Sequence, residues 1–291
     1  MRLDDLRPSD NVEDRRGEGG GFGGFGGYGP HIAVGGGGLG VVGLIIVSLL
    51  FGVDPTRLLG GGGPEAPPSQ YGEQQSRSGS RADDPAFQFA RRVIGSAEDV
   101  WTPILQQKGA QFQPATLTVY DYETPTGCGE GQSAAGPFYC PEDSRIYLDL
   151  SFFNELANRF GAPGEFAQAY VIAHEYGHHI QNLTGVFERH GGGGTGAESE
   201  SVRRELQADC YAGVWAYRAN AQFRILQEGD VEQGLRAASA VGDDTLEKES
   251  RGYAVPDSFT HGTSAQRVRW FKRGLAAGDM DQCDTFDEDI L

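Results

Sequence analysis

The sequence has few basic residues, and this limits the partners that it can bind. It carries 24 lysines and arginines against 41 aspartates and glutamates, for a formal net charge of -17 over 291 residues. Proteins that bind DNA or RNA neutralise phosphates with clustered basic side chains, and no basic stripe occurs in this chain. We therefore expect no nucleic-acid partner, and otherwise the acidic balance mainly reports solubility.

Cysteine is also scarce, and the spacing of the four cysteines excludes two kinds of site. No pair has the C-x-x-C spacing of a cysteine zinc site or of a thioredoxin-like redox site. An even number of cysteines is compatible with two disulfides in an oxidising compartment, or with four buried thiols. Among the three possible pairings we favour Cys128 with Cys140, across a local loop, and Cys210 with Cys283.

The first part of the chain lacks the pattern of a folded core. Residues 1–31 are polar and then rich in glycine and aromatic residues, which predicts a disordered tail. Residues 32–53 are free of charge, and their length matches the ~30 Å hydrocarbon thickness of a bilayer. This run predicts one transmembrane helix, with a cleaved signal peptide as the alternative. Residues 54–83, rich in glycine, proline, serine and glutamine, predict a flexible linker.

The charges that flank residues 32–53 indicate an orientation. Four arginines precede the run and only Arg57 follows it closely, which favours an N-terminus in the cytoplasm. The sequence therefore predicts a single-pass protein of the cell (inner) membrane. Its folded domain, residues 84–291, would then lie on the extracytoplasmic side, in agreement with the expected disulfides.

From residue 84 onward the sequence alternates between helical and strand patterns. Apolar residues at helical spacing predict a helix at 87–105, and β-branched and aromatic residues predict strands at 116–122 and 145–149. Residues 124–136 are predicted to be a loop. Further helices are expected at 152–160, 165–185, 198–217, 222–240 and 264–277. No repeat is visible, so we expect one α+β domain that is mostly helical with a small sheet.

The helix predicted at 165–185 carries an H-E-x-x-H pattern. His174 and His178 are four positions apart and lie on one helix face, so both imidazoles can reach one metal ion. Glu175 is turned by about 100° from His174, the step of a 3.6-residue helix, which lets it address a metal-bound water. The pattern is short, and a solvated histidine and glutamate face on an amphipathic helix is the alternative.

A second segment strengthens the metal interpretation. Glu205 and Asp209 share one face of the helix predicted at 198–217, a spacing that suits a third ligand and an acceptor for a ligand histidine. We therefore expect one Zn²⁺ per chain, bound by His174, His178 and Glu205, with a fourth position open for water. Small residues are expected to let the two helices approach closely: Ala173, Gly177, Ala208 and Ala212.

Other polar residues are weaker candidates. The metzincin pattern would need glycine and histidine where Gln181 and Thr184 stand, so that class is excluded. His261 precedes the helix predicted at 264–277 and either donates to the oxyanion of a tetrahedral intermediate or is structural. Arg267 is a weaker candidate for the same role, and His179 is expected to be solvated or to cap the helix. Poorer third ligands lie in or beside a glycine-rich loop: His190, Glu188, Glu198 and Glu200.

Three segments resemble the bacterial putative neutral zinc metallopeptidase family, a gluzincin-like group. They are HEYGHHIQNLTG at 174–185, ESVRRELQADCYAGVWA at 200–216 and HGTSAQRVRWFKRG at 261–274. The resemblance covers nearly the whole chain and implies a zincin-like fold. In such a fold a strand such as 145–149 could bind an extended peptide by edge pairing. The resemblance does not supply a substrate.

The functional prediction follows from these residues. We expect a membrane-anchored zinc-dependent metallopeptidase that hydrolyses peptide bonds in proteins or peptides, with Glu175 as the general base. The alternative is a catalytically silent, zinc-stabilised binding or scaffold protein of the same fold. Glu175 favours the enzyme, because a binding module has no need of a general base. A zinc hydrolase of other amides or esters is a third interpretation.

Overall fold

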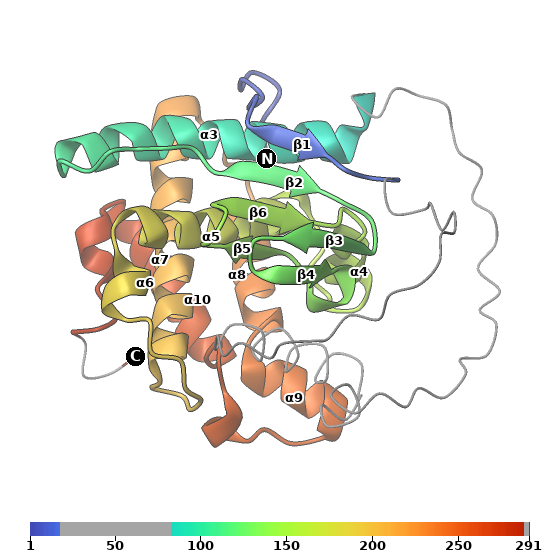
Figure 1. Ribbon diagram of the computed structural model, residues 1–291, viewed down its shortest axis with the longest axis vertical. Helices are drawn as coiled ribbons and strands as arrows, with labels where there is room; N and C mark the ends of the chain where they lie inside the picture. The colour runs from blue at the N-terminus through green and yellow to red at the C-terminus, as the bar shows by residue number, and fades with distance from the viewer. Residues whose placement is uncertain (18–82, 288–290) are drawn as a thin grey trace, which may run out of the picture.

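The computed structural model describes residues 1–17, 83–287 and 291, and it combines helices with a small sheet, as the sequence predicts (Figure 1). The four-stranded sheet has the order β1-β2-β6-β5. Strands β1, β2 and β6 are parallel, and β5 is antiparallel to β6. Their bounds are Val12–Asp14 for β1, Thr116–Val119 for β2, Phe138–Cys140 for β5 and Arg145–Leu148 for β6.

The two strands predicted from β-branched and aromatic residues, at 116–122 and 145–149, are present as β2 and β6. Leu117 pairs with Ile146, and Val119 pairs with Leu148. All four side chains are buried, so the pair forms the centre of the sheet. Since β6 is paired on both sides, its backbone is already used within the sheet. The implied edge pairing of a peptide with 145–149 is therefore wrong, because β5 and not β6 is the outer strand.

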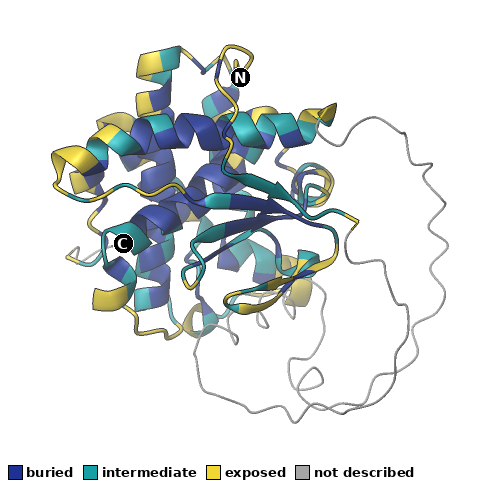
Figure 2. Cartoon of the chain, turned by 45° about the horizontal axis from the view of Figure 1, so that its top comes forward, coloured by how far each residue is buried: buried dark blue, intermediate teal, exposed yellow. Residues whose placement is uncertain are grey.

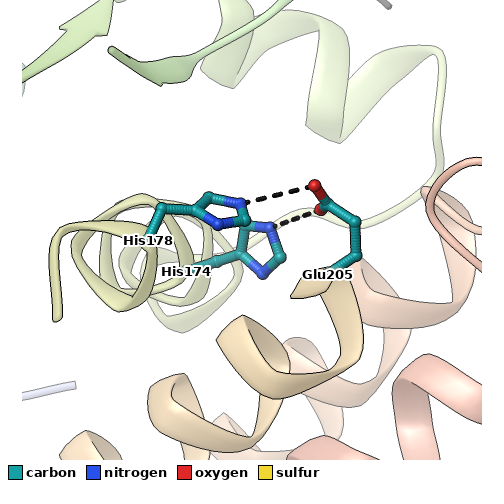
Figure 3. A group of neighbouring side chains, drawn as sticks. All are labelled: His174, His178 and Glu205. Atoms are coloured by element: carbon teal, nitrogen blue, oxygen red, sulfur yellow. Dashed lines mark hydrogen bonds and ion pairs between the residues drawn. The ribbon is translucent and has the colours of Figure 1, made fainter. Parts of the chain in front are cut away.

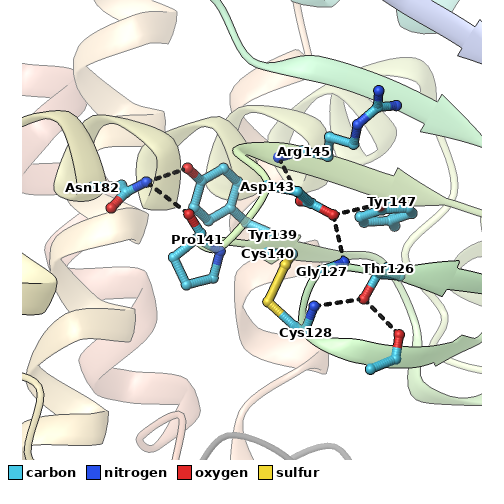
Figure 4. Close-up of a disulfide and its surroundings, with 11 residues drawn as sticks. Thr126, Gly127, Cys128, Tyr139, Cys140, Pro141, Asp143, Arg145, Tyr147 and Asn182 are labelled. Atoms are coloured by element: carbon cyan, nitrogen blue, oxygen red, sulfur yellow. Dashed lines mark hydrogen bonds between the residues drawn. A yellow bond between two sulfur atoms is a disulfide. The ribbon is translucent and has the colours of Figure 1, made fainter.

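The segment predicted to be a loop contains a second, two-stranded sheet. Strands β3 (Glu123–Thr126) and β4 (Gly129–Gln132) pair antiparallel as a hairpin. The two strands read ETPT and GEGQ, and the sequence did not predict them because they lack the aromatic and large aliphatic residues of a strand pattern. The predicted disulfide between Cys128 and Cys140 is present and ties the hairpin to β5, as Figure 4 shows. The second predicted disulfide, Cys210–Cys283, is present as well.

Helices make up most of the remaining described structure. The predicted helix at 222–240 is divided, because Gly229 has a left-handed φ of 86° and a new helix begins at Asp230. A helix at Asp243–Arg251 was not predicted, since its sequence DDTLEKESR has almost no apolar stripe. The helical bounds are α3 (Pro85–Gln107), α4 (Phe152–Asn158), α5 (Glu165–Leu183), α6 (Val186–Arg189), α7 (Glu200–Phe223), α8 (Asp230–Ala240), α9 (Asp243–Arg251) and α10 (Ser264–Ala277).

Helix α5 lies at the centre of the packing and is mostly buried (Figure 2). It contacts α3, α7 and α8. A Cβ atom added to Gly177 would stand 3.0 Å from the carbonyl oxygen of Ala208, so α5 and α7 approach backbone to backbone at this point. Small residues at this crossing were predicted to bring the two helices together, and the structure confirms it. The close crossing places the side chains of α5 beside those of α7.

Residues 1–17 belong to the folded domain, which corrects for these residues the prediction of a disordered tail at 1–31; residues 18–31 lie outside the described residues. Leu3 and Leu6 are buried in the main hydrophobic core, and residues 12–14 form β1. Ser9 is fully buried and donates to Glu98 on α3. The segment has too few apolar residues to predict a core by itself, and its order comes from α3 and β2. The domain therefore includes residues 1–17 and does not begin at residue 84.

The predicted transmembrane helix and single-pass membrane localisation are also corrected. Across residues 1–17, 83–287 and 291, none of the helices combines the length and the apolar content that a membrane crossing needs. Residues 32–53, where we predicted the span, lie outside the described residues. The described residues thus contain no helix of the kind that the predicted anchor requires. We therefore withdraw the membrane anchor and the localisation that depended on it.

Candidate metal centre

Two neighbouring helices bring the three predicted metal ligands together. His174 and His178 project from α5 toward Glu205 on α7 (Figure 3). The Nε2 atom of His174 lies 3.1 Å from Oε2 of Glu205, and the Nε2 atom of His178 lies 3.6 Å from its Oε1. One ligand atom from each residue lies within 4.8 Å of the others. Figure 3 shows the carboxylate facing both imidazoles.

This donor set fits a zinc ion. Two imidazole nitrogens and one carboxylate oxygen are the protein ligands of many catalytic zinc sites, which leave a fourth position open. In the part of the chain that the structure describes, these three residues are the one group of His, Cys, Asp or Glu side chains close enough to share an ion. Each oxygen of the Glu205 carboxylate faces the Nε2 atom of one of the two imidazoles. We therefore regard the group as a candidate metal centre.

Asp209, predicted as an acceptor for a ligand histidine, contacts His174. Its Oδ1 atom lies 2.9 Å from Nδ1 of His174, and its side chain is fully buried. An ionised carboxylate can only accept, so Nδ1 of His174 carries the hydrogen in this contact, which leaves Nε2 as the ring nitrogen that would bind a cation. The contact fixes the tautomer that a metal ligand needs.

Gln181 contacts Nδ1 of His178 in the same way, a role that was not predicted from the sequence. The Oε1 atom of Gln181 lies 2.8 Å from Nδ1 of His178. Its amide nitrogen donates to the carbonyl of Arg204 at 2.7 Å and to Gln207 at 3.1 Å, so the amide orientation is fixed by α7. A glutamine three residues after the second histidine was the available signal, since i and i+3 are neighbours on a helix.

The charges of the site shift its pKa values in opposite directions. Burial alone would lower the pKa of His174, but the Asp209 and Glu205 carboxylates raise it to about 9. Burial alone would raise the pKa of Glu205, but His178, His261 and His174 hold it well below its usual range. The site thus pairs an anionic Glu205 carboxylate with a His174 imidazole that holds its proton to a higher pH than usual when no cation is bound.

Glu175 is buried beside this group. Its side chain is 8% exposed, and burial raises its pKa above the ordinary value for a glutamate, with the nearby histidines acting against that shift. The carboxylate is not one of the three grouped ligands. A buried glutamate with a raised pKa next to a candidate metal centre suits proton transfer.

His261 lies in the loop before α10 and is held by Asp243. Its Nδ1 atom is 3.3 Å from Oδ1 of Asp243. The Oδ2 atom of Asp243 accepts the backbone N–H groups of Thr260 and His261 at 2.7 Å and of Gly262 at 3.0 Å. Burial lowers the pKa of His261, but Glu205 and Asp243 raise it above its ordinary value. The influence of Glu205 indicates that the imidazole lies near the candidate metal centre.

Two other candidates have different surroundings from those predicted. Arg267 is buried against Asp209, with Nε 2.8 Å from Oδ2, so its guanidinium is engaged inside the protein. His179 is buried and not solvated: Tyr139 contacts its Nδ1 at 3.1 Å and the carbonyl of Gln113 its Nε2 at 2.6 Å. Burial lowers its pKa to about 4.

The weaker third ligands lie outside the grouped ligands. His190 stacks on Phe286, with ring centroids 3.8 Å apart, and its Nδ1 lies 3.8 Å from Glu200. Glu188 is exposed. Neither these residues nor Glu198 is among the side chains that could share an ion with His174 and His178. Of the third ligands that the sequence offered, only Glu205 is brought to the two histidines.

Comparison with known proteins agrees with this site. A family model described as "Putative neutral zinc metallopeptidase" matches residues 1–286, a range that includes the N-terminal strand and every candidate site residue. The chain is 46% identical over 295 residues to "Uncharacterized protein YpfJ" of Escherichia coli (strain K12), with all of both chains covered. It is 43% identical over 224 residues to "Uncharacterized protein Rv2575" of Mycobacterium tuberculosis (strain ATCC 25618 / H37Rv), covering 73% of this chain and 74% of that protein.

No solved structure matches the chain. The likeness to the zincin fold that the resemblance implied therefore stays a prediction. The family model, in contrast, covers almost the full length and includes both motif-bearing helices. This chain belongs to the putative neutral zinc metallopeptidase family.

Proposed function

We propose that the protein hydrolyses peptide bonds with one Zn²⁺ bound by His174, His178 and Glu205. The observation that carries the proposal is the convergence of two imidazoles and one carboxylate, on two helices, beside the buried Glu175. The family description and the donor set point to the same ion. Zinc, when bound in such a site, polarises a carbonyl and lowers the pKa of a water.

Glu175 is the general base of this proposal. Its carboxylate accepts a proton from the water as the water oxygen bonds to the carbonyl carbon of the substrate. It then returns that proton to the nitrogen of the leaving amine as the carbon–nitrogen bond breaks, so the glutamate ends in its starting state. Burial raises the pKa of Glu175, which favours a group that must accept and then release a proton near neutral pH.

His261 is the donor to the substrate oxygen in this proposal. Negative charge develops on that oxygen when water adds to the carbonyl, and a preorganised cationic donor stabilises it. The raised pKa of His261 keeps the imidazole protonated to a higher pH than usual. The contacts of Asp243 with the ring and with the backbone on both sides of it fix the ring in place.

The experiment compares the full chain with Glu175→Gln, Glu205→Ala and a control, Glu188→Gln, which changes an exposed glutamate just beyond α5. Bound metal is measured by elemental analysis, and cleavage is measured on casein and on a peptide library. We expect one zinc in the wild type and in Glu175→Gln, with cleavage lost in that variant. Glu205→Ala should lose zinc as well as cleavage, and the control should match the wild type.

Two results would contradict the proposal. If the wild type holds zinc but cleaves nothing in the library, the zinc-stabilised scaffold interpretation is favoured over the enzyme. If Glu175→Gln cleaves as fast as the wild type, Glu175 is not the general base. His261→Gln tests the role of His261 as donor to the substrate oxygen. This variant should lower kcat while its zinc content stays at that of the wild type.

A further inference from the structure

Three helices meet at the carboxylate of Asp209. His174 and Tyr170 come from α5, Asp209 from α7 and Arg267 from α10. Arg267 binds both oxygens of the carboxylate: Nε lies 2.8 Å from Oδ2, and Nη2 lies 2.9 Å from Oδ1. The hydroxyl of Tyr170 donates to Oδ1, the same atom that contacts His174. Each of these side chains is buried, so water does not compete for the carboxylate.

The geometry leaves the carboxylate one orientation. Two parallel N–H groups of a guanidinium bind a carboxylate in its own plane, which fixes rotation about the last side-chain bond of Asp209. Arg267 is itself fixed, because Nη1 donates to the carbonyl of Val241 at 3.1 Å and Nη2 lies 3.2 Å from the Tyr170 hydroxyl. The Oδ1 atom is thereby held 2.9 Å from Nδ1 of His174.

The same contacts exclude the other role that the sequence suggested for Arg267. A residue that stabilises the oxyanion must point its donors at the substrate. Arg267 is 4% exposed, and its guanidinium contacts groups in the protein interior: Asp209, Tyr170, Val241 and His174. Its guanidinium lies behind His174, on the Nδ1 side of the ring, whereas Glu205 lies on the Nε2 side.

Close helix packing keeps this arrangement rigid. A Cβ atom added to Gly274 on α10 would stand 1.9 Å from the carbonyl oxygen of Cys210, the residue after Asp209. Tyr170 packs edge-on against Phe271 of α10, with ring centroids 5.2 Å apart. The backbones of α10 and α7 are therefore in contact next to Asp209, and this close crossing places Arg267 beside the carboxylate.

We propose that Arg267 and Tyr170 are positioning residues that orient His174 toward the metal through Asp209. The inference rests on the proposed metal site and deepens it, because through Arg267 it assigns part of the control of metal affinity to α10, which carries none of the ligands. Neither residue contacts substrate in this proposal. Loss of Arg267 frees the Asp209 carboxylate to rotate, and loss of the Tyr170 hydroxyl removes one of the donors that hold Oδ1 beside His174. Either change loosens the orientation of the His174 ring that presents Nε2 beside Glu205.

The experiment measures metal affinity in the full chain, with and without the two side chains. Zinc affinity is read by competition with a chromophoric chelator, and the visible absorption spectrum of the Co²⁺-loaded protein reports the ligand geometry. The variants are Arg267→Met, Arg267→Lys and Tyr170→Phe. Arg269→Met is the matched control, since Arg269 is exposed on the same helix. Val93→Ala, in the buried face of α3, controls for a general loss of stability.

We expect Arg267→Met to weaken zinc binding by about 10-fold, the lower end of the loss for a direct partner of a ligand, because Arg267 acts through Asp209. Arg267→Lys should fall between Arg267→Met and the wild type, because lysine keeps the charge without the paired N–H geometry. Tyr170→Phe, which keeps the ring packing, should bind less tightly and change the Co²⁺ spectrum. Both controls should bind as the wild type does.

The outcomes separate this inference from the proposed function. Wild-type affinity and an unchanged Co²⁺ spectrum in folded Tyr170→Phe and Arg267→Lys would overturn the inference, whatever the enzyme activity. Metal binding that weakens as expected, in a wild type that cleaves no peptide, would support the inference and contradict the peptidase proposal. A wild type that binds neither metal would overturn both. If Arg267→Met does not fold, Tyr170→Phe and Arg267→Lys still decide the question.

Discussion

The hydroxyl of Ser9 donates to the buried carboxylate of Glu98 at 2.6 Å, although 89 positions separate the two residues. Asn11 and Arg7 donate to the same carboxylate, each at 2.8 Å. A buried carboxylate costs stability unless hydrogen bonds replace its water, so the N-terminal segment stabilises α3 as much as α3 orders the segment. The first residues of the chain are therefore part of the domain.

This relationship predicts that substitutions near the N-terminus change stability. Leu6→Ala removes a side chain that is buried in the main core, and we expect a loss of about 2 to 4 kcal/mol in the free energy of unfolding. Asp5→Ala, at an exposed neighbour, should stay within about 0.5 kcal/mol of the wild type. Urea unfolding of the full chain measures both. Equal stability of the two variants would mean that residues 1–17 do not pack as described.

Gln181 provides a prediction about the second histidine. Gln181→Met keeps the length of the side chain but removes the acceptor of His178 Nδ1, so we expect zinc affinity to fall by about 10- to 100-fold. Chelator competition measures the affinity. Gln168→Met, earlier on the same helix, should bind zinc as the wild type does. A Gln181→Met protein with wild-type affinity would show that the tautomer of His178 is fixed by other means.

The buried His179 predicts how stability depends on pH. Its pKa is lowered to about 4 in the folded protein, against about 6.5 for a free histidine, so only the unfolded chain gains a proton as the pH falls between these values. The folded state therefore loses up to about 1.4 kcal/mol per pH unit over that window, and nothing further below pH 4.

The measurement compares the metal-free wild type with His179→Gln by urea unfolding from pH 7.5 to 4, with a chelator present. The variant lacks the titrating group, so its stability should fall less steeply than that of the wild type through this range. The difference between the two proteins at pH 7.5, where His179 is neutral in both states, reports the lost contacts with Tyr139 and Gln113. Parallel curves for the two proteins would contradict a buried neutral His179.

The two disulfides are predicted to contribute unequally. Cys210–Cys283 closes a separation of 73 residues and Cys128–Cys140 one of 12. The loop-closure model gives about 4 kcal/mol for the longer loop and about 3 kcal/mol for the shorter. Paired alanine substitutions, measured by thermal unfolding under non-reducing conditions, should therefore destabilise more at Cys210 and Cys283. The reverse order would show that the hairpin of β3 and β4 depends on its disulfide more than loop length implies.

The sequence by itself determined what depends on local geometry. His174 and His178 share a helix face because four residues make about one turn, and this holds wherever the helix lies. The amphipathic pattern located α5 closely and gave the exact bounds of α10, whose capping box of Thr263 and Gln266 is also local. The acid pair of Glu205 and Asp209 was likewise visible as a helix face.

Only the tertiary structure decided which distant groups meet. That Arg267 binds Asp209 instead of facing substrate depends on α10 crossing α7 at two glycines, Gly213 and Gly274, and no local pattern encodes a crossing. The order of the N-terminal segment depends on β2 and α3, which lie far along the chain. Helix α9 depends on Asp243, which accepts the backbone around His261, because its own residues bury little apolar surface. Local sequence patterns determine which residues share a helix face. The partners of a buried charge or of an edge strand come from distant segments, and only the tertiary structure brings them together.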